Sequence, residues 1–132
     1  MEPQDIRIML VEDNPEDVAF TKRVLRYNKL DKDLVIAVDG KEAMNALELL
    51  AKVGNLPNII LLDINLPDIS GIELLTKIKK DMRFNHIPII MLTGSNIDDD
   101  IQRSYDLGAS TYLVKPISKD ALMLVVQKLF NP

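Results

Sequence analysis

Charged and hydroxyl side chains stand at the ends of four apolar segments of this chain, and these side chains are the ones best suited to chemistry. The most apolar of the segments, residues 59–62, runs directly into Asp63. A carboxylate at the end of a buried strand destabilises a fold by several kcal/mol unless a neighbouring group offsets its charge. The residues in such positions are Glu12, Asp13, Asp63, Thr93 and Lys115.

Carboxylates that gather at one place repel one another, and a hard divalent cation relieves the repulsion. Mg²⁺ prefers octahedral oxygen coordination and is commonly held by one or two carboxylates together with a phosphate. The sequence has no cysteine and a single histidine, so oxygen atoms are the metal ligands on offer. An aspartate at such a site can attack a phosphoryl group, and Asp63 is placed for this role. The Lys115 ammonium and the Thr93 hydroxyl would then stabilise the phosphoryl oxygens.

Five apolar runs alternate with five segments of helical periodicity, and together they account for the whole chain. Continuous apolar runs are typical of strands buried on both faces of a parallel sheet. We therefore expect an α/β fold, a doubly wound five-stranded sheet in one domain of residues 1–132. The expected strands cover 6–11, 34–38, 58–63, 87–93 and 111–115. The expected helices cover 15–29, 41–53, 72–82, 97–108 and 118–130, with Asn14 and Ser118 as caps of the first and last.

Ligands of open α/β sheets bind beyond the carboxyl ends of the strands, here termed the carboxyl rim. The residues that follow the first, third, fourth and fifth strands would meet there, whereas Asp39, after the second strand, would lie at the edge of the sheet. Each residue has a simpler explanation on its own. Asp63 could cap a helix, Glu12 and Asp13 could be solvated in a loop, Lys115 could be a solvated charge, and Thr93 could have no role. The presence of all five at one rim is harder to explain by chance.

Four segments carry these residues, and they resemble the motifs of response-regulator receiver domains, the phosphoacceptor modules of two-component signalling. The segments are "LVEDN", "LLDINLPDISG", "MLTG" and "YLVKP", which occur in the family's order and spacing. The resemblance covers essentially the whole chain. It implies a flavodoxin-like (βα)5 fold with strand order 2-1-3-4-5. It also implies a response regulator that takes a phosphoryl group from a partner histidine kinase, catalyses only its own phosphorylation and dephosphorylation, and switches a protein-interaction face.

The resemblance implies a metal site and a phosphoacceptor on this chain. By position, Asp63 is the phosphorylated aspartate, and Asp13 is the direct Mg²⁺ ligand of an acidic pair completed by Glu12. Asn65 would contribute its backbone carbonyl to the metal. The pair is Glu-Asp where Asp-Asp also occurs in the family, a variation that keeps the charge.

The resemblance also implies a switch. Thr93 would be the switch hydroxyl, Lys115 the lysine that pairs with the phosphoryl group, and Tyr112 the aromatic side chain that moves between outward and inward positions. The Lys115–Pro116 peptide bond would be cis, which directs the lysine inward. Gly94 would leave the phosphoryl group accessible, so we expect rapid phosphotransfer and a limited phosphoryl lifetime.

Three alternatives compete with this interpretation. Haloacid-dehalogenase phosphohydrolases also use a strand-end aspartate with Mg²⁺, but they need a second aspartate where this chain has Asn65, and the chain is short for that fold with its cap. A nucleotide-binding protein is disfavoured because no glycine-rich phosphate loop is present. A receiver-like interaction module that is never phosphorylated is disfavoured by the intact set of Asp13, Asp63, Thr93 and Lys115.

Composition restricts the partners. A net charge of −4 and a pI near 4.9 argue against direct nucleic-acid binding. The sequence shows no signal peptide and no apolar run that could span a membrane, so we expect a cytoplasmic protein. His86 lies in a loop segment and is read as solvated, so the phosphodonor would be another protein. The motifs "VEDNPEDV" and "YLVKP" resemble those of stand-alone receivers that pair with phytochrome-type kinases.

The last expected helix has a wider apolar arc than one buried stripe requires. Residues Leu122, Val125, Val126 and Leu129 should face the sheet. Met123 and Phe130 flank this stripe on one side and Leu124 on the other. The excess could form a homodimer or target surface with the fourth helix and the fifth strand, or it could simply border the core.

Overall fold

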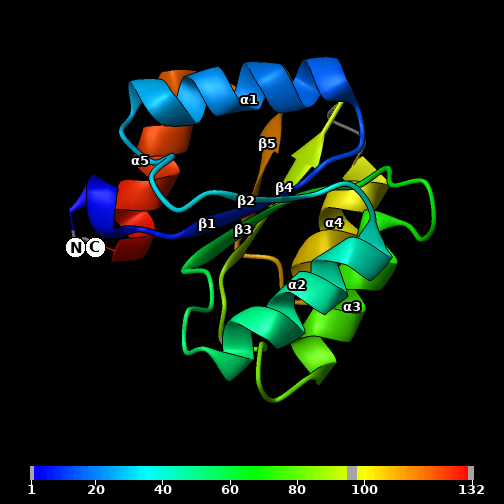
Figure 1. Cartoon of the computed structure of the whole chain (residues 1–132). Helices are drawn as coiled ribbons and strands as arrows, with labels where there is room; N and C mark the ends of the chain where they lie inside the picture. The colour runs from blue at the N-terminus through cyan, green and yellow to red at the C-terminus, as the bar shows by residue number, and fades with distance from the viewer. Residues whose placement is uncertain (1, 95–97, 131–132) are drawn as a thin grey trace.

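The computed structural model describes residues 2–94 and 98–130, and it shows one sheet with helices on both faces (Figure 1). The sheet has five strands in the order β2-β1-β3-β4-β5, and all four neighbouring pairs are parallel. This confirms the expected flavodoxin-like topology. The strands are β1 Ile8–Val11, β2 Val35–Ala37, β3 Ile59–Asp63, β4 Ile89–Thr93 and β5 Thr111–Val114. The helices are α1 Pro15–Tyr27, α2 Gly40–Lys52, α3 Gly71–Lys80, α4 Asp98–Asp106 and α5 Lys119–Phe130.

The expected elements all occur, with ends shifted by one or two residues in most cases. The first strand is shorter than expected because a turn of 3-10 helix, Pro3–Asp5, precedes it and Ile6 is already outside the ladder. The Asn14 side chain caps α1 by accepting hydrogen bonds from the N–H groups of Glu16 and Asp17. Ser118 Oγ accepts from Ala121 N at the start of α5. The predicted start of the fourth helix at Ile97 lies outside the described residues.

Alternating residues of the strands face two separate hydrophobic layers. Even positions of β1, such as Leu10, and odd positions of β3, such as Leu61, pack with α1 and α5. The opposite set, including Met9 and Leu62, packs with α2 and α3. Figure 1 shows α1 and α5 on one side of the sheet and α2, α3 and α4 on the other. Every residue of β1, β3 and β4 is buried, which explains why these segments read as unbroken apolar runs.

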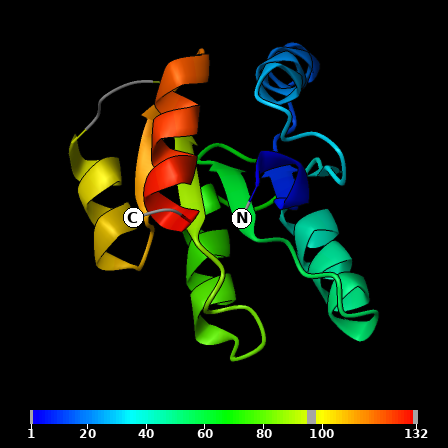
Figure 2. The ribbon, with the colours of Figure 1, turned by 90° about the vertical axis from the view of Figure 1, so that its left-hand side faces the viewer.

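The apolar arc of α5 is mostly used by the core. Leu122 and Val126 are buried, and the flanking side chains pack against the same layer: Met123, Val125, Leu129 and Phe130. Leu124 is 53% exposed. Figure 2 shows β5 between α4 and α5. Leu124 is on α5, the helix beside the β5 edge of the sheet. Among the described residues, no helix is both long and apolar enough to cross a bilayer.

The loop between α3 and β4 is less solvated than its sequence suggests. His86 is exposed, as expected, but Phe84 is fully buried in the layer beneath α2 and α3. Lys79 Nζ donates hydrogen bonds to the carbonyls of Asn85 and Ile87, which ties the loop back to α3. The loop is therefore part of the packed domain.

Candidate functional site

The carboxyl rim brings together the side chains that the sequence singled out. In the register of the sheet, Val11 pairs with Leu62, Asp63 with Leu92, and Thr93 with Val114. The strands β1, β3, β4 and β5 therefore end at nearly the same level. Residues at or just beyond these ends are neighbours because of the topology, although they are far apart in sequence.

Three carboxylates form a compact cluster at this rim. One oxygen each from Glu12, Asp13 and Asp63 lies within 4.8 Å of the other two. Glu12 is 0% exposed and Asp63 is 3% exposed, whereas Asp13 faces solvent. Glu12 is held in place because its N–H continues the β1–β2 ladder to the Ala37 carbonyl at 2.9 Å. Two buried carboxylates at this separation need a compensating cation.

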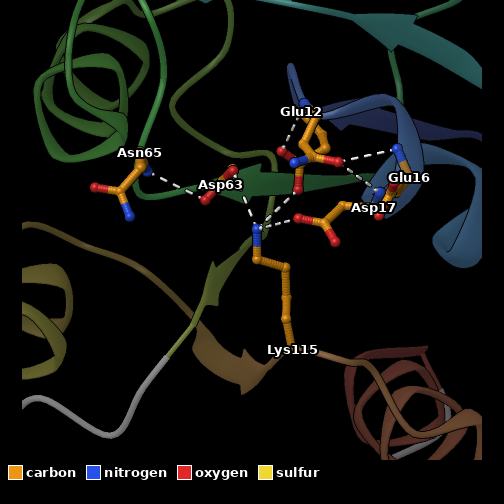
Figure 3. Close-up of polar contacts among 7 residues, drawn as sticks. Glu12, Glu16, Asp17, Asp63, Asn65 and Lys115 are labelled. Atoms are coloured by element: carbon orange, nitrogen blue, oxygen red, sulfur yellow. Dashed lines mark hydrogen bonds and ion pairs between the residues drawn. The ribbon is translucent and has the colours of Figure 1, made fainter.

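Lys115 supplies a positive charge at the centre of the cluster. Its Nζ atom lies 3.0 Å from Glu12 Oε1, 3.0 Å from Asp17 Oδ2 and 3.2 Å from Asp63 Oδ2. Figure 3 shows the extended lysine side chain with its ammonium group between these carboxylates. Burial opposes the charged form, but hydrogen bonds to Asp17 and Glu12 and the charges of Asp63 and Glu12 outweigh it and raise the pKa of Lys115.

One ammonium does not neutralise the whole cluster. Burial, followed by the neighbouring carboxylate of Asp63, raises the pKa of Glu12 to about 7, although the contact with Lys115 acts in the opposite direction. Glu12 therefore changes its charge near neutral pH. A divalent cation bound beside such a carboxyl group favours its charged form.

Asp63 is not the cap of the helix that follows it. Ser70 takes that position, with Oγ accepting from Glu73 N at 3.1 Å. Asp63 Oδ1 instead accepts from the N–H of Asn65 in the loop that follows β3, which leaves Oδ2 directed at Lys115 (Figure 3). The simpler explanation of Asp63 as a helix cap is thus wrong.

The loop after β3 is fixed where α3 begins and again in its middle. A Cβ atom on Gly71 would lie 2.1 Å from the Asp63 carbonyl oxygen, so only glycine fits where α3 begins. In the middle of the loop, the Asp68 carboxylate accepts hydrogen bonds of 2.9 Å from both Gly40 N and Lys41 N at the start of α2. These contacts hold the backbone of Asn65 beside the carboxylate cluster.

Thr93 and Tyr112 lie on the β4–β5 side of the rim. Thr93 is buried at the end of β4, and its carbonyl accepts from Lys115 N at 2.7 Å. The Lys115–Pro116 peptide bond is cis. Tyr112 packs edge-on against Tyr105 of α4, with ring centroids 6.3 Å apart and planes at 83°.

Asp17 is the site residue that the sequence argument missed. It lies in the first turn of α1, where the helix dipole commonly stabilises acidic residues. Its position therefore gave no reason to predict a contact with Lys115. Asp13 precedes the helix, so its four-residue spacing from Asp17 carries no helical signal, and the contact with Lys115 depends on how α1 lies across the end of the sheet.

The donor set fits a hard divalent cation. It consists of carboxylate oxygens with the backbone of Asn65 nearby, and it includes no sulfur or imidazole ligand. Each of the buried carboxylates also keeps an oxygen that Lys115 does not hold. The cluster thus has the charge and ligand type for a metal that prefers oxygen.

Comparison with known proteins places this geometry in a family. A model of the response regulator receiver domain matches residues 8–127. The chain belongs to that family. The receiver is 38% identical over 122 residues to the response regulator Rcp1 of Synechocystis sp., a match that covers 91% of this chain and 83% of Rcp1.

Solved structures of response regulators resemble the receiver along nearly its whole length. The Mn²⁺-bound form of Rcp1 has a TM-score of 0.76 and 37% identity, covering 95% of this chain and 93% of that one. The bacteriophytochrome response regulator AtBRR has a TM-score of 0.83 and 37% identity, covering 94% and 91%. The phosphorylated cyanobacterial phytochrome response regulator RcpA has a TM-score of 0.76 and 36% identity, covering 94% and 90%.

The receiver therefore is a two-component response regulator of the family that the sequence motifs indicated. Members of this family are signalling modules, and their acidic pocket takes a divalent metal. The fold prediction is confirmed by the strand order and by these structural neighbours.

Proposed function

We propose that the receiver accepts a phosphoryl group on Asp63 and uses it to change a protein-interaction surface. The single observation that carries this proposal is the position of Asp63 Oδ2, 3.2 Å from Lys115 Nζ and inside the carboxylate cluster. The buried Asp63 carboxylate has one oxygen hydrogen-bonded to its own loop and the other to Lys115. These contacts fix the orientation of the carboxylate, as attack by a nucleophile requires. Glu12 makes contacts of the same two kinds, with Oε2 accepting from Asn14 N and Oε1 from Lys115, so the choice of Asp63 also rests on its position in the segment "LLDINLPDISG".

We propose Mg²⁺ as the resident cation, held by Glu12, Asp13, Asp63 and the backbone carbonyl of Asn65. The donor set supports a hard cation, and the Mn²⁺-bound Rcp1 structure supports a divalent one. When bound, the cation neutralises charge on the phosphoryl oxygens and on the carboxylates.

The chemistry required of the protein is a single displacement. An Asp63 carboxylate oxygen attacks the phosphorus of the donor, the bond from phosphorus to the donor atom breaks, and an acyl phosphate forms on Asp63. Lys115, already within hydrogen-bond reach, pairs with a phosphoryl oxygen, and the Thr93 hydroxyl donates to another. In a second step, water attacks the phosphorus, the bond from phosphorus to the Asp63 oxygen breaks, and inorganic phosphate leaves the restored carboxylate, so the receiver catalyses only its own phosphorylation and dephosphorylation.

The donor in this proposal is a phosphohistidine on a separate kinase. His86, the chain's own histidine, is exposed on the loop between α3 and β4. This loop precedes β4, whereas the rim lies where the strands end. Similarity to AtBRR and RcpA supports a phytochrome-type kinase as the partner. Gly94, exposed beside the site, supports open access for the donor.

The output in this proposal passes through α4, β5 and α5. Thr93 and Tyr112 connect the site to this face, and Tyr112 contacts Tyr105 of α4 directly. Tyr105 and Leu124 are large exposed side chains on α4 and α5. A homodimer or a target protein could use this face. Analytical ultracentrifugation with and without a phosphoryl analogue tests the homodimer, which a monomer at high concentration in both states would exclude.

We further propose that residues 1–132 act as one receiver domain in the cytoplasm, without direct contact to nucleic acid. The net charge of −4 and the absence of cysteine support this assignment.

The proposed function is tested by measuring intact mass after incubation with acetyl phosphate, with and without Mg²⁺. We expect a gain of one phosphoryl group that requires Mg²⁺ and is absent from Asp63→Asn. No gain in any condition would leave a receiver fold used for docking alone.

A further inference from the structure

Asp17, in the first turn of α1, holds the Lys115 ammonium as closely as Glu12 does. Its Oδ2 atom is 3.0 Å from Lys115 Nζ, the same distance as Glu12 Oε1 and shorter than the 3.2 Å of Asp63 Oδ2. Glu12 and Asp63 belong to the three-carboxylate cluster, and Asp17 lies outside it. Lys115 is therefore shared between two candidate metal ligands and one carboxylate that is not a candidate.

A bound cation and the Lys115 ammonium would draw on the same oxygens. A divalent cation at Glu12 and Asp63 weakens the two contacts that these carboxylates make with Lys115, because each carboxylate's charge is then partly satisfied. The Lys115 side chain is only 18% exposed. An ammonium that lost its partners in this position would destabilise the metal-bound state.

We propose that Asp17 is a positioning residue for Lys115: it keeps the ammonium paired beside the site while a divalent cation takes the oxygens of Glu12 and Asp63. The inference rests on the proposed metal-dependent function and adds a carboxylate that does not itself bind the metal. Asp17 is 40% exposed, so its charge stays partly hydrated and does not add a fully buried carboxylate to the cluster.

The structure has room for this transfer of contacts. A pocket of about 560 Å³ adjoins the pair, and its lining includes Asp17, Phe20, Gly94, Lys115 and Pro116. Figure 3 shows Asp17 approaching the ammonium from α1 while Asp63 approaches from β3. A small displacement of Nζ towards α1 would thus keep the Asp17 contact and lengthen the contact with Asp63.

The test is calorimetric titration of the full chain with Mg²⁺ alone, comparing wild type, Asp17→Asn and Glu16→Gln. Glu16 is a matched control, because it is the neighbouring exposed acid of the same helical turn and its described contact is a backbone N–H to Asn14. Both variants remove one negative charge near the cluster. We expect Asp17→Asn to weaken Mg²⁺ binding about two- to fivefold more than Glu16→Gln does, the range for a partly exposed ion pair.

Two further variants separate positioning from a general loss of structure. Asp17→Glu keeps the carboxylate and should restore most of the affinity. In a Lys115→Met background, Asp17→Asn should weaken Mg²⁺ binding no more than Glu16→Gln does, because the ammonium is gone. Thermal unfolding in EDTA should be alike for Asp17→Asn and Glu16→Gln.

The outcomes distinguish this inference from the proposed function. Equal effects of Asp17→Asn and Glu16→Gln in the wild-type background, or an Asp17→Asn effect that persists without Lys115, would overturn the positioning role and leave the metal site intact. Wild type that fails to bind Mg²⁺ would overturn the metal site itself, and the positioning role with it.

Discussion

Asp63 Oδ2 and Lys115 Nζ lie 3.2 Å apart although β4 separates their strands in the sheet. The lysine follows β5 and reaches across the end of β4 to the end of β3. This contact explains how an aspartate can end the most apolar strand, because the charge that burial would penalise has a partner. The same contact places a cation where a phosphoryl group on Asp63 would carry its negative charge.

Removal of this ammonium should destabilise the metal-free receiver. We expect Lys115→Met to lower the free energy of unfolding in EDTA by about 2 kcal/mol, because two buried carboxylates lose their counter-charge and bind protons instead. Saturating Mg²⁺ should remove most of the difference. Urea unfolding checks this, with Lys22→Met, at an exposed position of α1, as the control. Equal stability of the two variants in EDTA would contradict the assigned role of Lys115.

Metal binding should depend on pH through Glu12, whose pKa is raised to about 7 by burial and then by Asp63. A protonated carboxyl must release its proton to bind the cation, so Mg²⁺ affinity should rise with pH, by up to about tenfold per pH unit below that value. Calorimetry across this pH range checks the prediction. Glu12→Gln should flatten the profile, and a wild-type affinity that falls as pH rises would contradict it.

The stability of the metal-free receiver should follow the opposite trend. The folded state binds the Glu12 proton more tightly than the unfolded chain does, because its pKa is raised from 4.5 to about 7. The contribution of Glu12 to the free energy of unfolding is therefore fully present below pH 4.5, and it is lost as the pH rises through about 7. Glu12→Gln should remove this part of the pH dependence when unfolding is measured in EDTA.

Gly71 should tolerate no side chain. A Cβ atom there would lie 2.1 Å from the Asp63 carbonyl oxygen and 2.7 Å from Ile64 Cα, and both are backbone atoms that cannot move aside cheaply. We expect Gly71→Ala to lower the free energy of unfolding by about 3 kcal/mol or more. Gly94→Ala is the control, since no atom lies within 4 Å of the added Cβ. Chemical denaturation that ranked the two variants equally would contradict this account of the loop.

Asp68 should stabilise the receiver at neutral pH and not in acid. Hydrogen bonds from the backbone, first of all from Gly40 N, hold the pKa of Asp68 below its usual value. The contribution of Asp68 to stability is therefore present above the pKa that Asp68 has in the unfolded chain. It is lost as the pH falls through the lowered pKa of the folded state. Asp68→Ala should lower the melting temperature at neutral pH, and the gap to wild type should narrow in acid. Asp33→Ala, at an exposed position, serves as the control.

Much of the fold could be predicted because two simple signals agree. Strands such as Ile59–Asp63 are buried on both faces and so read as unbroken apolar runs, and alternation with helices then requires a parallel sheet. Parallel strands end at a common rim, so Glu12, Asp63 and Lys115 could be placed together without knowledge of any distance. The 3-10 turn before β1 carried no comparable signal.

Contacts that depend on how elements are oriented could not be predicted. Asp17 meets Lys115 across 98 residues of sequence because of the angle at which α1 crosses the sheet, which periodicity does not encode. The hydrogen bond that Gly40 N donates to the Asp68 carboxylate depends in the same way on the distance between the β3–α3 loop and α2. Phe84 is buried in the core, but its mostly polar neighbours in the loop gave no sign of this in the sequence.

The most direct test of the central claim is to locate the phosphoryl group. After incubation with acetyl phosphate and Mg²⁺, borohydride reduction converts an acyl phosphate into a stable alcohol, and peptide mapping identifies the residue that carried it. We predict conversion at Asp63 alone, dependent on Mg²⁺ and absent from Asp63→Asn. Conversion at Glu12, Asp13 or any other carboxylate, or no conversion at all, would contradict the assignment of Asp63 as the phosphoacceptor.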